Sequence, residues 1–165
     1  MGIALSEING SSREEFVRVV GPVFEHSPWI ADLATTQRPF LSRSTLHTAM
    51  CAIVEKAGAE KQLALIRAHP DLVGRVVLTD ESNREQTAAG LMQLTAEEVT
   101  LFNNYNTEYK ARFGFPFIIC ARKNKKEAIL SAFPVRLKNP RETEIQTALD
   151  QIFQIAELRL ADLIA

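Results

Sequence analysis

Hydrophobic side chains recur at helical spacing along most of the chain. Between Ser42 and Ala57 the apolar residues fall on one helical face, and the segment 60–68 continues the pattern until Pro70. The C-terminal residues repeat it over more than five turns: Ile145, Leu149, Ile152, Phe153, Ala156, Leu160 and Leu163. This period predicts a helix in each of the three segments.

Polar residues divide the rest of the chain into further helices. Three pairs have the spacing of a capping box, in which each residue of the pair bonds the backbone of the other: Ser12 with Glu15, Ser82 with Glu85, and Thr95 with Glu98. Two further helix starts are predicted at Ser27-Pro28-Trp29 and at Asn139-Pro140. In the first, Ser27 is the cap and Pro28 takes the first helical position. Residues 71–81 keep no period and predict a loop.

One segment departs from the helical pattern. Residues 113–122 are apolar, aromatic and β-branched, and Gly, Pro and Arg bracket them. A single strand without a partner cannot form a sheet. We therefore expect an all-α, single-domain helical bundle over residues 1–165, with a short buried irregular segment near 114–122. Such a segment can direct backbone N–H groups toward a ligand.

Charge and composition narrow the functional classes. The net charge of -1 gives no general surface for nucleic acid, and no apolar run has the length of a membrane span. Cys51 and Cys120 lie among apolar residues and are expected to be buried thiols, which suits a reducing compartment. Because no signal peptide or peroxisomal address is visible, we expect a cytoplasmic protein. No set of His, Cys and carboxylate residues has zinc-ligand spacing, so no metal is expected.

The candidate chemistry begins at His69. Pro70 forces a helix to end before it, so the imidazole is expected to project from a helix end on a rigid backbone. Histidine transfers protons near neutral pH, and the polar cluster Ser82-Asn83-Arg84-Glu85-Gln86 could face it. Two simpler interpretations stand beside this one. His69 could be a helix-end histidine bonded to backbone, and Glu85 could only close a cap with Ser82.

The order and spacing of several motifs resemble one family, the 2-oxo-4-hydroxy-4-carboxy-5-ureidoimidazoline (OHCU) decarboxylases of urate breakdown. Three segments carry most of the resemblance: Ala68-His69-Pro70-Asp71-Leu72, then Ser82 to Gln86 with Ala89-Gly90-Leu91, then Asn106 to Arg122. Arg38-Pro39-Phe40 and Ala156 to Leu160 are also similar to the family. The resemblance covers nearly the whole chain.

The resemblance implies an all-α homodimer that decarboxylates OHCU to (S)-allantoin and carbon dioxide without a metal or an organic cofactor. The substrate is a small anionic ureidoimidazoline. Its carboxylate is attached to a carbon next to a C=N group, which can accept the bond electrons when carbon dioxide leaves. The protein then has to supply orientation, charge and a proton.

The same resemblance implies the site residues. His69 is expected to transfer the proton, and Glu85 to orient or tune it or to bind the substrate hydroxyl. The residues expected to contact substrate are Pro70, Ser82, Glu85, Gln86, Phe117, Ile118, Ile119, Cys120 and Ala121. An anionic substrate also needs a cation, and we prefer Arg159 to Arg122 for that role. The alternatives for Arg159 are an ion pair with an acidic neighbour such as Glu157 or Asp162, or plain solvent exposure.

Two other functions stay open from the sequence. The chain could be a non-catalytic helical interaction module, in which His69 and Glu85 are only caps. It could also be an isomerase or hydrolase of a related ureide, which would share the pocket but release no carbon dioxide. Convergence of His69, Glu85, Gln86 and an arginine around one pocket would favour an enzyme.

Overall fold

Capping side chains begin two of the longest helices where the sequence predicts them. In the computed structural model, which describes residues 2–74 and 78–165, Ser42 and Thr45 bond each other's backbone N–H at 3.0 Å before α4 (Arg43–Lys56). Thr95 and Glu98 do the same at 3.1 Å before α7 (Ala96–Phe113). α7 ends at Gly114, whose φ of 80° lies in the left-handed region that favours glycine.

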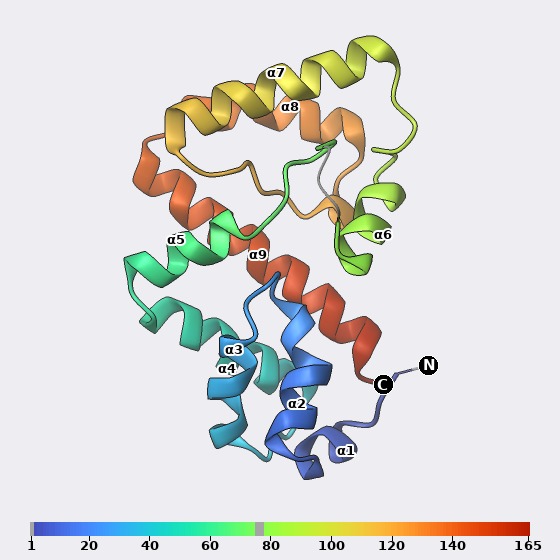
Figure 1. Cartoon of the computed structure of the whole chain (residues 1–165), viewed down its shortest axis with the longest axis vertical. Helices are drawn as coiled ribbons and strands as arrows, with labels where there is room; N and C mark the ends of the chain where they lie inside the picture. Colours follow the sequence, from blue (N-terminus) through green and yellow to red (C-terminus); the bar gives the residue numbers. More distant parts are fainter. Residues whose placement is uncertain (1, 75–77) are drawn as a thin grey trace. The chain divides into compact units, whose positions relative to one another are not determined.

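The described residues form nine α-helices and no strand apart from one isolated bridge (Figure 1). The helices other than α4 and α7 are α1 (Leu5–Gly10), α2 (Arg13–Val20), α3 (Trp29–Ala34), α5 (Ala59–Arg67), α6 (Asp80–Ala88), α8 (Lys126–Leu137) and α9 (Arg141–Leu163). Three short 3-10 turns are η1 (Gly21–Val23), η2 (Thr35–Gln37) and η3 (Ala121–Lys123). The all-α prediction is confirmed. In the described part of the chain, no helix is both long and apolar enough to cross a membrane.

The chain falls into two units, so the single domain stays a prediction. The first unit runs to Ala68 and includes Phe153–Ala165. It holds α1 to α5 and the C-terminal part of α9, packed on a core that contains fully buried Phe16, Ile30 and Met50. Both cysteines of the chain are free and buried, as predicted, and Cys51 belongs to this core.

The second unit, His69–Ile152, has an aromatic core around the irregular segment. Residues 115–121 are all buried, which confirms the predicted buried segment. The Phe117 ring stacks on Phe133 of α8 with 3.8 Å between centroids, and Tyr109 of α7 meets Phe117 edge-on. The irregular segment therefore contacts both α7 and α8, which pack against each other (Figure 1).

A buried polar network ties this segment to its helices. Arg136 of α8 pairs with Glu144 of α9 at 2.8 Å and donates to the Ile118 carbonyl at 2.5 Å. The Tyr109 hydroxyl donates to the Glu144 carboxylate at 2.5 Å, and burial raises the pKa of Tyr109 above its ordinary value. The hydroxyl thus keeps its proton for that hydrogen bond. Charged groups this deeply buried require partners, and here each has one.

Several predicted helix boundaries are wrong. α6 begins at Asp80 because Thr79, not Ser82, caps it: Thr79 Oγ1 accepts the Ser82 N–H at 3.2 Å. Asp80 and Glu81 then occupy the first turn, where acidic residues favour the helix dipole. α3 begins at Trp29 without a side-chain cap, and the Ser27 hydroxyl donates to the Glu25 carbonyl instead. The predicted loop 71–81 includes residues 75–77, which lie outside the described residues.

Candidate active site

The buried face of α6 is polar. A helix normally turns apolar side chains toward the interior, but the buried residues of α6 are Ser82, Glu85 and Gln86, each at most 9% exposed. Their spacing of three and four residues places them on one side of the helix. Burial of polar groups requires hydrogen-bond partners and adds little to a core, so such a face is typical of a binding site.

Glu85 is not a helix cap. Because Thr79 caps α6, Glu85 lies in the second turn, beyond the reach of a capping box. The interpretation in which Glu85 only closes a cap with Ser82 is therefore wrong. The other role expected of Glu85, toward His69 or the substrate hydroxyl, stays a prediction.

His69 lies where the sequence predicts it, just beyond the end of α5 at Arg67. Its side chain and that of Pro70 are half-buried. The segment that follows is bonded to α6, because the Gln86 Oε1 accepts the Val73 N–H at 3.1 Å. The structure therefore joins the loop that carries His69 to the polar face of α6.

The third predicted segment meets the same helix. α6 packs against η3, which begins at Ala121, directly after the buried stretch 117–120. Burial raises the pKa of the Cys120 thiol above its ordinary value, and the nearby Glu85 carboxylate adds to this effect. Within the second unit, three segments expected to contact substrate are thus brought together around α6.

The backbone of Cys120 has partners that the sequence did not predict. Its N–H donates to the Gln151 Oε1 at 2.8 Å, and its carbonyl accepts from the Asn124 Nδ2 at 3.0 Å. These bonds fix the irregular segment in the absence of helix or sheet. The Cys120 N–H is thus bonded to a side chain of α9, and the proposed donation of N–H groups to substrate has to rest on other residues of the stretch.

Arg159 belongs to the first unit and lies in a buried ion pair. Its Nη2 is 2.9 Å from the Glu25 Oε2, and its Nη1 donates to the Pro22 carbonyl at 3.1 Å. The alternative of an ion pair proposed an acidic neighbour within α9, whereas Glu25 is distant in the sequence. The role of Arg159 toward substrate stays a prediction. Arg122, the second choice, is exposed in η3.

No set of three or more His, Cys, Asp or Glu side chains among the described residues is arranged to hold a metal ion. His47 instead bonds the Phe153 carbonyl through Nε2 at 2.8 Å, and Cys51 lies 3.4 Å from the same nitrogen. His26 is 3.9 Å from the Glu25 carboxylate. These histidines thus have neighbours typical of structural roles.

Comparison with known proteins gives a consistent picture. The family model for OHCU decarboxylase matches residues 9–161. A 2-oxo-4-hydroxy-4-carboxy-5-ureidoimidazoline decarboxylase of Haloferax volcanii is 42% identical over 97% of this chain and 95% of its own. A uric acid degradation bifunctional protein of Bacillus subtilis is also 42% identical over 97% of this chain, which covers 32% of that protein.

Solved structures are similar as well. The crystal structure of an (S)-allantoin synthase matches with a TM-score of 0.82 and 29% identity, over 99% of this chain and 54% of the other. A crystal structure of OHCU decarboxylase in the presence of (S)-allantoin has a TM-score of 0.70 and 24% identity, over 92% and 97% of the two chains. The second likeness supports the fold.

Proposed function

Because this chain belongs to the OHCU decarboxylase family, we propose that it releases carbon dioxide from OHCU and forms (S)-allantoin in urate breakdown. The observation in the structure that best supports this activity is the buried polar face of α6, which is bonded to the loop after His69 and packs against η3. A small polar ligand needs such convergent polar groups, whereas an interaction module needs an apolar surface.

The proposed chemistry divides between substrate and protein. When the bond to the carboxylate breaks, its electron pair moves into the neighbouring C=N group, and carbon dioxide leaves. The resulting nitrogen takes up a proton, the hydroxyl loses one to become a carbonyl, and the ureido-bearing carbon gains one. Proton delivery from a single face gives the S enantiomer.

His69 is the proposed proton-transfer residue for this last step, because an imidazole both accepts and donates near neutral pH. Glu85 is proposed to orient His69 or to bind the substrate hydroxyl. The Gln86 Oε1 is bonded to Val73, so its amide N–H groups are the atoms proposed to meet the ureido group. Ser82, Pro70 and residues 117–121 complete the proposed contacts.

The decisive experiment supplies freshly generated OHCU and follows carbon dioxide together with the optical activity of allantoin. The proposal expects enzyme-dependent release of both, with (S)-allantoin in excess. A change in the ureide without carbon dioxide would indicate an isomerase or hydrolase. No acceleration at all would leave the interaction module as the function.

We also propose that the protein is a cytoplasmic homodimer. Its two buried free thiols suit a reducing compartment, and the homodimer follows from the family resemblance. Light scattering at micromolar concentration should give about twice the mass of the 18.4 kDa chain if an interface of standard size forms. A monomer over that concentration range contradicts the assembly, and fractionation of cells tests the compartment.

A further inference from the structure

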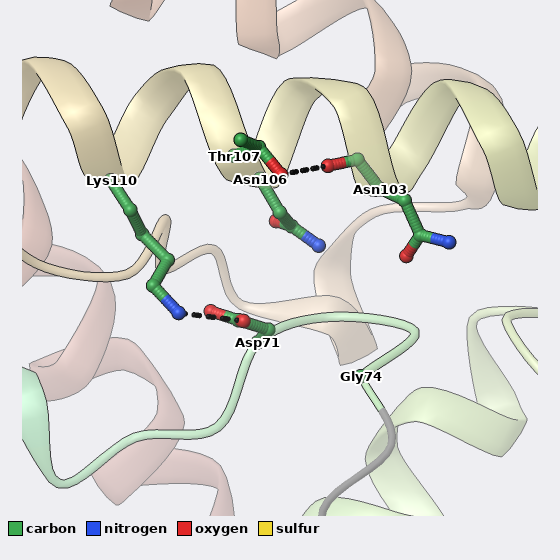
Figure 2. A pocket seen from close by; sticks show the side chains of 6 residues that line it. All are labelled: Asp71, Gly74, Asn103, Asn106, Thr107 and Lys110. Carbon is green, nitrogen blue, oxygen red and sulfur yellow. Dashed lines mark hydrogen bonds and ion pairs between the residues drawn. The ribbon is translucent and has the colours of Figure 1, made fainter.

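The turn that follows His69 and Pro70 is held by side chains from two helices. Residues 71–74 close a turn in which the Gly74 N–H donates to the Asp71 carbonyl at 3.3 Å. From α7, the Asn106 Nδ2 donates to the Leu72 carbonyl at 2.7 Å. Figure 2 shows Asn106 of α7 above the loop. The turn is therefore fixed by tertiary contacts in addition to its own hydrogen bond.

Asn106 and Gln86 hold the same peptide group. The Leu72 carbonyl and the Val73 N–H belong to the single planar unit between these residues. Asn106 binds its oxygen, and Gln86 of α6 binds its N–H at 3.1 Å. Fixing both ends of one peptide determines its orientation, and with it the direction in which the chain leaves His69 and Pro70.

The backbone at this peptide is strained. Val73 has a φ of 59°, a left-handed conformation that β-branched residues rarely adopt. Such a conformation persists only where surrounding contacts impose it, and it is common at functional loops. The two hydrogen bonds on the Leu72–Val73 peptide are contacts of this kind, so removal of one of them should let the turn relax.

Asn106 contributes little net stability through its contact with the loop. The side chain is only 5% exposed, and among the described residues no hydrogen-bond partner reaches its Oδ1. An unpaired buried acceptor destabilises the folded state and offsets part of the gain from the Nδ2 bond. A neighbouring contact, Lys110 to Asp71 at 3.0 Å, is partly exposed and contributes little. Stability alone therefore does not account for Asn106.

We propose that Asn106 is a positioning residue for decarboxylation: by binding the Leu72 carbonyl, it sets the loop that places His69 and Pro70 against the substrate. The inference rests on the proposed role of His69. Asn106 does not touch the reacting atoms, and it acts through the backbone of residues 69–73. A displacement of about 1 Å in a proton-transfer group lowers turnover by about a hundredfold, so such a residue has a large kinetic effect.

The test compares two substitutions on one helix. Asn106→Leu keeps the branched shape of the side chain at a somewhat larger volume and removes both the donor and the unpaired acceptor, so the melting temperature should change little. Asn103→Leu is the matched control, because Asn103 is exposed and lines the same hollow of about 500 Å³ without bonding the loop (Figure 2). We expect Asn106→Leu to lower kcat by about 10- to 100-fold. Asn103→Leu should stay near the wild-type value.

A double-mutant cycle separates positioning from general loss of folded protein. A structural defect would lower kcat by the same factor whether His69 is present or not. If Asn106 acts through His69, adding Asn106→Leu to His69→Ala should change the residual kcat by less than about twofold. If the leucine variant fails to fold, Asn106→Ala replaces it in the cycle, because it removes the same hydrogen bond without adding bulk.

The outcomes are distinct. Full activity of Asn106→Leu beside an inactive His69→Ala overturns the positioning role and leaves the proposed role of His69 intact. An equal loss in both backgrounds also overturns it. Full activity of His69→Ala overturns both the positioning role of Asn106 and the proposed role of His69. The positioning role is supported if Asn106→Leu strongly lowers kcat in the wild-type background but not in the His69→Ala background. The melting temperature should then be unchanged.

Discussion

The guanidinium of Arg159 lies 2.9 Å from the carboxylate of Glu25, with the two side chains 5% and 1% exposed. Both charged groups are buried, so each depends on the other to offset the loss of its hydration. Arg159 is also the cation that the sequence predicts for the substrate carboxylate. A substitution at Arg159 therefore affects stability as well as binding, and the two effects have to be separated.

We predict that Arg159→Met lowers the free energy of unfolding by about 3–5 kcal/mol, because it leaves the Glu25 carboxylate buried without its partner. Urea denaturation at pH 7 measures this change. The double variant Glu25→Gln/Arg159→Met removes both charges and should recover most of the loss. A double variant as unstable as the single one would show that the ion pair is not the cause.

The double variant also isolates the role of Arg159 in binding. If Arg159 meets the substrate carboxylate, the double variant should bind substrate more weakly by about 1.5–3 kcal/mol, while binding of allantoin, which lacks the carboxylate, should change far less. Glu25→Gln alone is the control, since it keeps the guanidinium. Equal weakening of both ligands would place Arg159 near the ureido group or ring.

His69→Ala should lower turnover by about 10²–10⁴-fold, because proton transfer then has to come from water. The fold should stay intact, since His69 lies outside the helices and is only half-buried. Far-UV circular dichroism checks the fold, and the rate of (S)-allantoin formation checks the chemistry. A folded variant with near-normal turnover would remove His69 from the mechanism.

Glu85→Gln should abolish most activity while the protein melts nearly as the wild type does. The change keeps size and hydrogen-bonding capacity but removes the charge. Glu85 does not cap α6, so loss of a cap cannot account for any effect. Glu81→Gln in the first turn of the same helix is the matched control and should stay active. Normal turnover of Glu85→Gln would show that catalysis does not need the negative charge of Glu85.

Stability should fall above about pH 9 partly because of Cys51. Burial raises the pKa of this thiol from 9.0 to about 12, and Glu55 and Glu157 add to the effect. Between these values the unfolded chain loses the thiol proton while the folded chain keeps it, so rising pH favours unfolding. Urea midpoints at pH 8 and pH 10 should therefore fall more for the wild type than for Cys51→Ala. Equal decreases would exclude a contribution from Cys51.

The sequence predicts local features of the fold well. Ser12 and Thr95 cap α2 and α7 as expected, because the pattern of a cap is encoded within four residues. α6 starts earlier than expected, since Thr79 and Ser82 both have the chemistry of a cap and only the structure decides between them. The sequence pattern does not predict α8. Pro134 lies inside it, and an interior proline normally indicates the end of a helix.

In the candidate site, too, the sequence reveals local patterns but not contacts between distant residues. The motifs indicated His69, Glu85 and Gln86, because their types and order are visible in the chain. The partner of Arg159 was missed, because Glu25 is remote in sequence and no local pattern connects the two. Asn106 and Gln151 were missed as supports for the same reason. Each bonds a backbone atom of a distant loop. Nearly every residue type offers the same backbone atoms, so no sequence pattern marks such a bond.

The bridge between Ile3 and Ile164 brings the ends of the described chain together (Figure 1). The Ile3 N–H donates to the Leu163 carbonyl at 2.7 Å, and the Ala165 N–H donates to the Ile3 carbonyl at 3.0 Å. A Cβ on Gly2 would lie only 2.6 Å from the Ala165 nitrogen, so the approach requires glycine. Adjacent ends can be joined by a short peptide and the chain reopened at a surface loop, so this fold suits circular permutation.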